Sequence, residues 1–126
     1  MKNHNKSCTR VLLVDDEDFL VKLWKNILEK QGYKVTGYTE AKLALDDFRR
    51  NPFDFDIVVT DQSMPDINGK ELAVELLKIR KDIKIIICTG FLEHIDRFND
   101  IGKGICEFLL KPFDNNTLMK AIERNT

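Results

Sequence analysis

Short apolar runs alternate along this chain with longer segments in which apolar residues recur at helical spacing. Runs of strand length are predicted at residues 10–14, 33–38, 56–60, 83–88 and 106–110. The third and fourth runs contain Ile57-Val58-Val59 and Ile85-Ile86-Ile87, continuously apolar stretches that are typical of strands covered on both faces. Because helical segments separate the strands, the pattern predicts an α/β fold with one parallel sheet and crossover helices.

A helical segment is expected after each strand, and the fourth has the weakest apolar stripe. Gly32 lies just past the first segment and is a plausible C-cap. The stripes consist of Phe19, Leu20, Leu23, Trp24, Ile27 and Leu28; Ala41, Leu43, Ala44, Leu45 and Phe48; Leu72, Ala73, Leu76, Leu77 and Ile79; Phe91, Leu92, Ile95, Phe98 and Ile101; and Leu118, Met119, Ala121 and Ile122.

Length and charge narrow the possible functions. A chain of 126 residues, 43% of them hydrophobic, suits one compact domain, predicted at residues 10–126 after a disordered lead-in at residues 1–9. With 20 basic and 21 acidic residues the net charge is -1, so direct nucleic acid binding is not expected. The apolar runs are too short for membrane insertion, and a cytoplasmic protein is predicted.

The cysteines and histidines do not form a metal-binding pattern. Cys8, Cys88 and Cys106 are odd in number and widely spaced, so they are expected to be reduced. His4 and His94 are isolated in the sequence, and no metal role is expected for either.

Four consecutive acidic residues, 15–18, follow the first apolar run. Two carboxylates about 4 Å apart repel by roughly 4 kcal/mol at an effective dielectric of 20, so a divalent cation with oxygen ligands would stabilise them. Capping of the helix that follows explains the same residues, because acidic side chains are favourable in a first helical turn. The stretch alone leaves both interpretations open.

Polar side chains also follow the other predicted strands. In open α/β sheets, ligands bind at the carboxyl ends of the strands, where Asp15, Asp16, Asp61, Thr89 and Lys111 are expected to converge. Each has an ordinary structural explanation when taken singly. Together they suit phosphoryl transfer, in which Mg²⁺ and a lysine neutralise charge and a carboxylate acts as nucleophile to give an aspartyl phosphate.

These residues stand in motifs that resemble the receiver domain of two-component response regulators, the CheY-like superfamily. The motifs are Asp15-Asp16, Asp61 with Met64-Pro65 and Gly69, Thr89-Gly90, and Lys111-Pro112-Phe113. The resemblance runs from Arg10 to the end of the chain. It implies a single (βα)5 doubly wound, flavodoxin-like domain whose parallel sheet has the strand order 2-1-3-4-5.

The same resemblance implies a phosphoacceptor site. Asp61 would take a phosphoryl group from a phosphohistidine of a histidine kinase or a histidine phosphotransfer protein. Mg²⁺, with Mn²⁺ as a substitute, would be bound by Asp16, Asp61 and the backbone carbonyl of Ser63, and by Asp15 partly through water. The domain would promote its own phosphorylation and dephosphorylation without being a turnover enzyme.

Further residues are assigned roles by the resemblance. Lys111 would pair with the phosphoryl group and Thr89 would donate its hydroxyl to it, while Pro112 would follow a cis peptide bond. Phe108 occupies the aromatic switch position, although a permanently buried core ring remains an alternative.

The signal is expected to leave through the fourth helix, fifth strand and fifth helix. Partner-facing residues there are expected among Phe91, Leu92, His94, Ile95 and Phe98. The effector is unidentified, and a monomer or weak dimer is expected. Similarity of residues 89–91 and 104–112 to receivers fused to hybrid sensor histidine kinases leaves open whether the chain is a stand-alone receiver or part of a longer protein.

Two other functions remain as alternatives. An FMN-binding flavodoxin-like protein would share the sheet, but four acids after the first strand would repel a phosphate. A phosphatase of the haloacid dehalogenase type also uses an aspartate nucleophile, with a second aspartate two residues later, where this chain has Ser63. Bound yellow chromophore would favour the first alternative, and turnover of a phosphate ester the second.

Overall fold

The computed structural model describes residues 9–96 and 103–126. The strands are β1 (Arg10–Val14), β2 (Lys34–Tyr38), β3 (Ile57–Asp61), β4 (Lys84–Thr89) and β5 (Glu107–Leu110). The helices are α1 (Asp18–Lys30), α2 (Ala41–Arg50), α3 (Gly69–Ile79), the short 3-10 helix η2 (Leu92–His94) and α5 (Asn115–Arg124).

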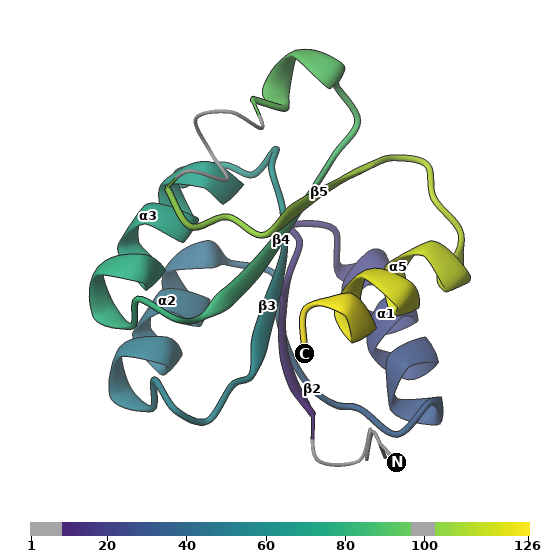
Figure 1. Cartoon of the computed structure of the whole chain (residues 1–126), viewed down its shortest axis with the longest axis horizontal. Helices are drawn as coiled ribbons and strands as arrows, with labels where there is room; N and C mark the ends of the chain where they lie inside the picture. Colours follow the sequence, from purple (N-terminus) through teal and green to yellow (C-terminus); the bar gives the residue numbers. More distant parts are fainter. Residues whose placement is uncertain (1–8, 97–102) are drawn as a thin grey trace.

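The strands form one parallel sheet in the order β2-β1-β3-β4-β5. Helices α2 and α3 cover one face of this sheet, and α1 and α5 cover the other (Figure 1). The predicted doubly wound, flavodoxin-like fold is therefore confirmed. Strand order reverses between β1 and β3, which is where such sheets bind their ligands.

The strand boundaries differ from the predicted ones by one residue: β2, β3, β4 and β5 begin one residue later, and β3 and β4 also end one residue later. Strand β3 continues to Asp61, which pairs in register with Cys88, and β4 continues to Thr89, which pairs with Leu110. Hydrogen bonding between strands thus extends past the last apolar residue of each run. As a result, two of the predicted site residues are themselves strand residues, held by the backbone of the sheet.

Each face of the sheet has its own core. The core beneath α2 and α3 includes Leu12, Val58, Ile85, Ile87, Phe48, Leu72 and Phe108. The core beneath α1 and α5 includes Val11, Val59, Ile86, Leu28, Leu118 and Ile122. Because β1, β3 and β4 are covered on both faces, the carboxyl ends of these strands rest on a well-packed base.

The predicted apolar stripes are correct for most positions of α2, α3 and α5, but not for α1. Phe19 and Leu23 of the α1 stripe are 72% and 39% exposed, and Leu43 of α2 is 48% exposed, whereas Val21, which the predicted α1 stripe omits, is buried. The stripe for α1 was therefore wrong in part, because its apolar residues extend around more of the helix than the sheet can cover. The C-cap residue of α1 is Gln31, and Gly32 follows it with a φ of 99° and an N–H that donates to the Glu29 carbonyl, so the glycine ends the helix from the position after the cap.

Between β4 and β5 the described residues contain only the 3-10 helix η2 of the predicted fourth helix. Its residue Leu92 and the preceding Phe91 are exposed. Phe98 and Ile101 of the predicted stripe lie outside the described residues, as do residues 1–8 of the predicted lead-in. No helix in the part of the chain described is both long and apolar enough to cross a membrane.

Candidate functional site

Four strands deliver polar residues to one edge of the sheet. Asp15 directly follows β1, Asp61 ends β3, Thr89 ends β4 and Lys111 directly follows β5. Asp15, Asp61 and Thr89 are buried although each carries a polar side chain. Burial of such groups is costly unless they are paired, so their contacts with one another determine what the site can do.

Three carboxylates meet at this edge. One oxygen from each of Asp15, Asp16 and Asp61 lies within 4.8 Å of the others. Asp16 is exposed while the other two are buried, so solvent reaches the cluster at Asp16. Clustered carboxylate oxygens are the ligands that hard divalent cations prefer.

Lys111 supplies a positive charge to this cluster. Its Nζ lies 2.7 Å from Oδ1 of Asp61 and 3.5 Å from Oδ2 of Asp15. Its backbone N–H donates to the Thr89 carbonyl at 2.7 Å, which fixes the start of the chain after β5. One ammonium group facing three carboxylates leaves the site with a surplus of negative charge.

Burial and Lys111 have opposite effects on the pKa values of the buried carboxylates. Burial raises the pKa of Asp61, an effect that the hydrogen bond and charge of Lys111 oppose and the charge of Asp16 reinforces. Burial also raises the pKa of Asp15, while the N–H of Glu17 opposes the rise. Burial opposes the charged form of Lys111, but hydrogen bonding to Asp61 raises the pKa of this amine overall.

The acidic residues after β1 both stabilise the start of α1 and contribute to the carboxylate cluster. Oδ1 of Asp15 accepts the N–H of Glu17 at 2.9 Å, and Asp18 lies in the first turn of α1. The helix begins after Glu17, whose side chain makes no capping hydrogen bond. Asp15 thus stabilises the turn through one oxygen and faces Lys111 through the other.

The loop between β3 and α3 packs closely on Asp61. A Cβ built on Gly69 would lie 2.6 Å from the Asp61 carbonyl oxygen, so this position admits only glycine without a shift. Asn68 and Glu71 form a reciprocal capping box at the start of α3. Asp66 has a φ of 66°, a left-handed conformation that Asp and Asn adopt more readily than most residues.

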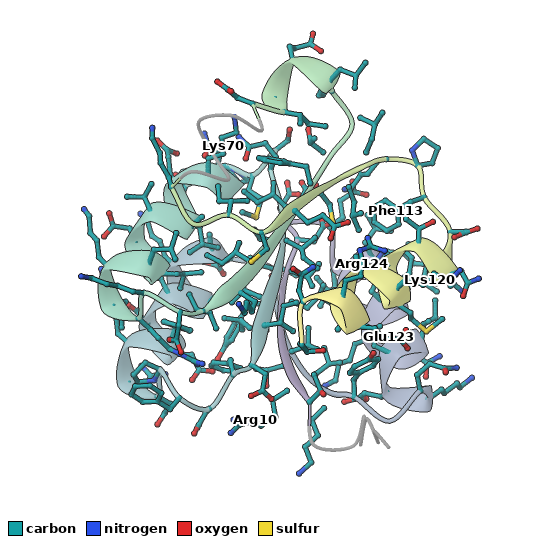
Figure 2. All side chains as sticks on the ribbon, viewed as in Figure 1. Arg10, Lys70, Phe113, Lys120, Glu123 and Arg124 are labelled. Carbon is teal, nitrogen blue, oxygen red and sulfur yellow. The ribbon has the colours of Figure 1, made fainter. Side chains whose placement is uncertain are left out.

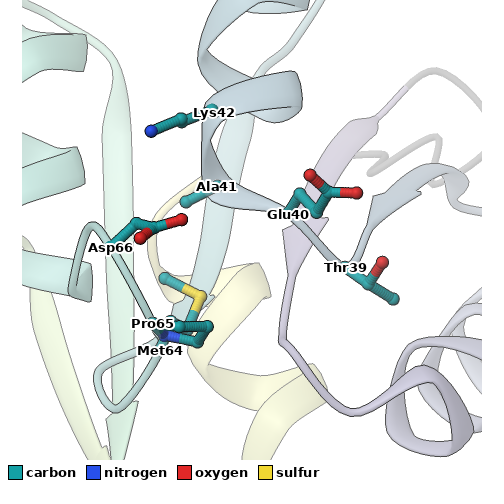
Figure 3. A pocket seen from close by; sticks show the side chains of 7 residues that line it. All are labelled: Thr39, Glu40, Ala41, Lys42, Met64, Pro65 and Asp66. Carbon is teal, nitrogen blue, oxygen red and sulfur yellow. The ribbon is translucent and has the colours of Figure 1, made fainter.

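A small cavity of about 40 Å³ separates this loop from the start of α2. In Figure 3, Met64 and Asp66 come from the loop and face the first residues of α2, including Ala41. The cavity is large enough for ordered water. None of the three clustered carboxylates lines this cavity.

Gln62 contributes to the site although sequence reasoning did not identify it. It is buried, its N–H donates to the Cys88 carbonyl at 2.8 Å, and its Oε1 accepts the N–H of Lys70 at 2.9 Å. Gln62 therefore joins β3 and β4 to the start of α3 directly beside Asp61. Its position in the sequence, a polar residue between a predicted buried strand and the start of the next helix, could have indicated this role.

The Thr89 hydroxyl is engaged by residues of the following loop. Its Oγ1 lies 2.9 Å from Nδ1 of His94 and accepts the N–H of Phe91 at 3.2 Å. The rings of Phe91 and His94 pack edge to face with centroids 5.2 Å apart. In the sequence, His94 is an isolated histidine and a candidate partner-facing residue, and its contact with Thr89 was not predicted, because the short 3-10 turn has no apolar signature.

Phe108 is buried in the core beneath α2 and α3, and the Lys70 amine lies 5.7 Å from its ring centroid. The structure therefore describes the inward ring position. On the opposite face, Trp24 and Phe113 pack with ring centroids 5.4 Å apart, and Figure 2 shows Phe113 beside α5. The peptide bond before Pro112 is cis.

Sequence comparison identifies the family of this chain. The response regulator receiver domain matches residues 11–123. The chain belongs to the response regulator receiver domain family. It is 33% identical over 117 residues to chemotaxis protein CheY of Thermotoga maritima, with 91% of this chain and 95% of that protein covered. It spans only 49% of response regulator SaeR of Staphylococcus aureus, to which it is 32% identical over 90% of its own length.

Solved receiver structures have the same fold. A receiver domain protein from Clostridium thermocellum matches with a TM-score of 0.87 at 29% identity, covering 93% of each chain. Response regulator TrrA of Thermotoga maritima, solved in complex with Mg²⁺ and BeF, matches with a TM-score of 0.82 at 30% identity, covering 94% of this chain and 99% of that one.

In this receiver domain, the residues predicted from the sequence are largely brought together. Asp15, Asp16, Asp61 and Lys111 form one cluster, and Thr89 is joined to it through the backbone of Lys111. Ser63 is exposed on the loop that follows Asp61, and the metal contact of its carbonyl stays a prediction.

Proposed function

We propose that this receiver domain is a phosphoacceptor switch in which Asp61 accepts a phosphoryl group from a phosphohistidine of a sensor kinase or phosphotransfer protein. The observation that carries the proposal is the 2.7 Å contact between Lys111 and Asp61 within the cluster of three carboxylates. The arrangement gives a nucleophilic carboxylate, a cation for the incoming phosphoryl oxygens and a surplus of acidic ligands for a metal ion.

The donor set fits Mg²⁺. Ligands 2.0–2.1 Å from one ion lie at most about 4.2 Å apart, so carboxylate oxygens that lie within 4.8 Å of one another need at most a small adjustment or one bridging water. Asp16 and Asp61 would bind the ion together with the Ser63 carbonyl, and Asp15 partly through water; Mn²⁺ would substitute. When bound, the ion supplies charge neutralisation for the carboxylates and the phosphoryl oxygens.

The transfer balances without a further reactant. A carboxylate oxygen of Asp61 attacks the phosphorus, and the new O–P bond forms as the P–N bond of phosphohistidine breaks. The donor ring carries a proton on its other nitrogen, so the histidine takes the electron pair of the broken bond and leaves as a neutral imidazole. Lys111 moves its ammonium group from the carboxylate toward a phosphoryl oxygen, and Thr89 donates its hydroxyl to another. Hydrolysis by water then returns Asp61 and inorganic phosphate.

The switch follows from the change in charge. A phosphoryl group adds about −1.5 to −2 charge, and it recruits Lys111 and Thr89 from their present partners. Thr89 ends β4 and Lys111 follows β5, the last two strands at one edge of the sheet. Movement of these residues would therefore shift the population of conformations of the surface around η2, β5 and α5. An effector or an attached domain in the cytoplasm would read that surface.

Phosphorylation with a small donor tests the proposal. The chain is incubated with acetyl phosphate and Mg²⁺, and its intact mass is measured. We expect one added phosphoryl group in the parent and none in Asp61→Asn or after chelation of Mg²⁺. Asp66→Asn is the matched control, because Asp66 is an exposed aspartate of the same loop.

Other outcomes have clear meanings. An unmodified parent, or equal modification of Asp61→Asn, would contradict the proposal. Repeated turnover of para-nitrophenyl phosphate would favour a phosphatase instead. Transfer from a phosphorylated histidine phosphotransfer protein to Asp61, followed with radiolabelled phosphate, tests the partner class directly.

A further inference from the structure

A contact outside the charged cluster bears on how readily this receiver switches. The Thr89 hydroxyl lies 2.9 Å from Nδ1 of His94 and accepts the N–H of Phe91. Thr89 is almost fully buried at 1% exposure, so these neighbours replace water around its hydroxyl. The side chain that is to bind a phosphoryl oxygen is thus already bound by another group.

The hydrogen-bonding capacity of the threonine makes this contact competitive. A hydroxyl has a single proton to donate and two lone pairs, and one lone pair is taken by the Phe91 N–H. In the tautomer that carries the ring proton on Nε2, Nδ1 of His94 is an acceptor, and the hydroxyl donates its only proton to it. A phosphoryl oxygen has no proton and must accept one, so it competes with His94 for the same donor.

The local structure holds His94 in place for this role. The 3-10 helix η2 turns the chain back after β4, with the His94 N–H donating to the Phe91 carbonyl at 3.1 Å. The edge-to-face packing of Phe91 on the imidazole fixes the ring plane. The Thr89 carbonyl accepts the Lys111 N–H, so the main chain of Thr89 is held while its side chain can change partners.

We propose that His94 is a positioning residue that restrains the Thr89 hydroxyl and so opposes the phosphoryl-bound conformation. This inference rests on the proposed function of Asp61. The hydrogen bond between Thr89 and His94 must break when Thr89 binds the phosphoryl group. A substitution that removes this bond should therefore favour the phosphoryl-bound state by about threefold to tenfold, the range expected for a single hydrogen bond. His94 therefore sets the threshold for switching without contacting the phosphoryl group.

The experiment measures the affinity of the chain for BeF in the presence of Mg²⁺, with Trp24, the chain's single tryptophan, as the fluorescence reporter. His94→Phe keeps an aromatic ring against Phe91 and removes the acceptor. His94→Asn keeps a hydrogen-bonding atom near the position of Nδ1. We expect His94→Phe to bind threefold to tenfold more tightly than the parent, by the same single-bond argument, and His94→Asn to bind like the parent.

A double-mutant cycle and a spectroscopic signature separate this role from a structural one. In a Thr89→Val background, His94→Phe is expected to leave the affinity unchanged, because no hydroxyl remains to restrain. In the parent, the ¹⁵N resonance of His94 Nδ1 is expected to shift on addition of Mg²⁺ and BeF, as the hydroxyl leaves the imidazole.

Equal affinity of His94→Phe and the parent, an equal gain in His94→Asn, or the same gain in the Thr89→Val background would overturn the inference. Acetyl phosphate labelling of the parent is run alongside. A parent that is labelled at Asp61 while the His94 variants behave like it refutes only the restraint, whereas an unlabelled parent refutes the proposed function itself.

Discussion

Gly69 approaches Asp61 so closely that a Cβ on Gly69 would lie 2.6 Å from the Asp61 carbonyl oxygen. The glycine begins α3, and its N–H donates to the Gln62 carbonyl at 3.0 Å. The helix start and the proposed phosphoacceptor therefore share one tightly packed contact. Space at this contact, more than any polar interaction, limits which residue can follow Asn68.

We expect Gly69→Ala to destabilise the fold by about 1–3 kcal/mol, the usual cost of overpacking, and to reduce acetyl phosphate labelling by displacing Asp61. Gly90→Ala is the matched control, because a Cβ there meets nothing within 4 Å. Urea unfolding and intact-mass labelling of both variants provide the measurements. Equal stability of the two variants would show that the loop relaxes freely.

Asp15→Asn is expected to raise the free energy of unfolding at pH 7 in EDTA, because it removes a carboxylate whose ionised form burial disfavours. Burial raises the pKa of Asp15, so the native state binds a proton more readily than the unfolded state. Stability is then lost as pH rises from the unfolded pKa of about 3.9 through the raised native pKa. The asparagine removes this loss while its Oδ1 still accepts the Glu17 N–H.

Thermal unfolding in EDTA from pH 4 to pH 8 measures the effect. The advantage of Asp15→Asn should shrink toward pH 4, and it should diminish when Mg²⁺ is added, because the ion favours the ionised carboxylate of the parent. Asp66→Asn serves as the exposed control. A variant less stable than the parent in EDTA at pH 7 would contradict the prediction.

Lys111→Met should destabilise the metal-free protein by about 1–3 kcal/mol, because it leaves buried Asp61 without its partner. Mg²⁺ should stabilise this variant more than it stabilises the parent, since the ion no longer competes with the ammonium group. The increase in melting temperature at saturating Mg²⁺ is the measurement, with the exposed Lys103→Met as control. An equal increase in melting temperature in parent and variant would contradict the prediction, because it would show that Lys111 does not compete with Mg²⁺.

Cys88 should react with an alkylating reagent more slowly than Cys106, which is only half-buried. It is buried beside Asp61 in β4, and burial raises the pKa of its thiol to about 12. In a Cys8→Ser, Cys106→Ser background, the alkylation rate at Cys88 should follow opening of the sheet and become slower with Mg²⁺. Rapid alkylation under native conditions would contradict the tight packing at this strand end.

The fold was predictable because alternating apolar runs and helical stripes leave few ways to cover a sheet. The charged cluster was predictable for a related reason, since the carboxyl ends of parallel strands meet at one edge and Asp61 and Lys111 stand at two of them. The resemblance then assigned roles that spacing alone left open.

What the sequence missed depends on short-range geometry. The contact of His94 with Thr89 arises from a 3-10 turn, whereas periodicity predicted a full helix in that segment. Gln62 acts through hydrogen bonds to β4 and α3, which no apolar pattern records. Phe19 was assigned to a buried stripe but is exposed, because a helix packed on one face cannot cover all its apolar residues.

Lys111 is held at both of its ends. Its amine rests on Asp61, while its amide is fastened to the Thr89 carbonyl. Movement of the amine would therefore act directly on the hydrogen bond that joins the residue after β5 to the end of β4, with no side chain between them. Lys111 alone would therefore couple phosphorylation of Asp61 to the edge of the sheet formed by β4 and β5.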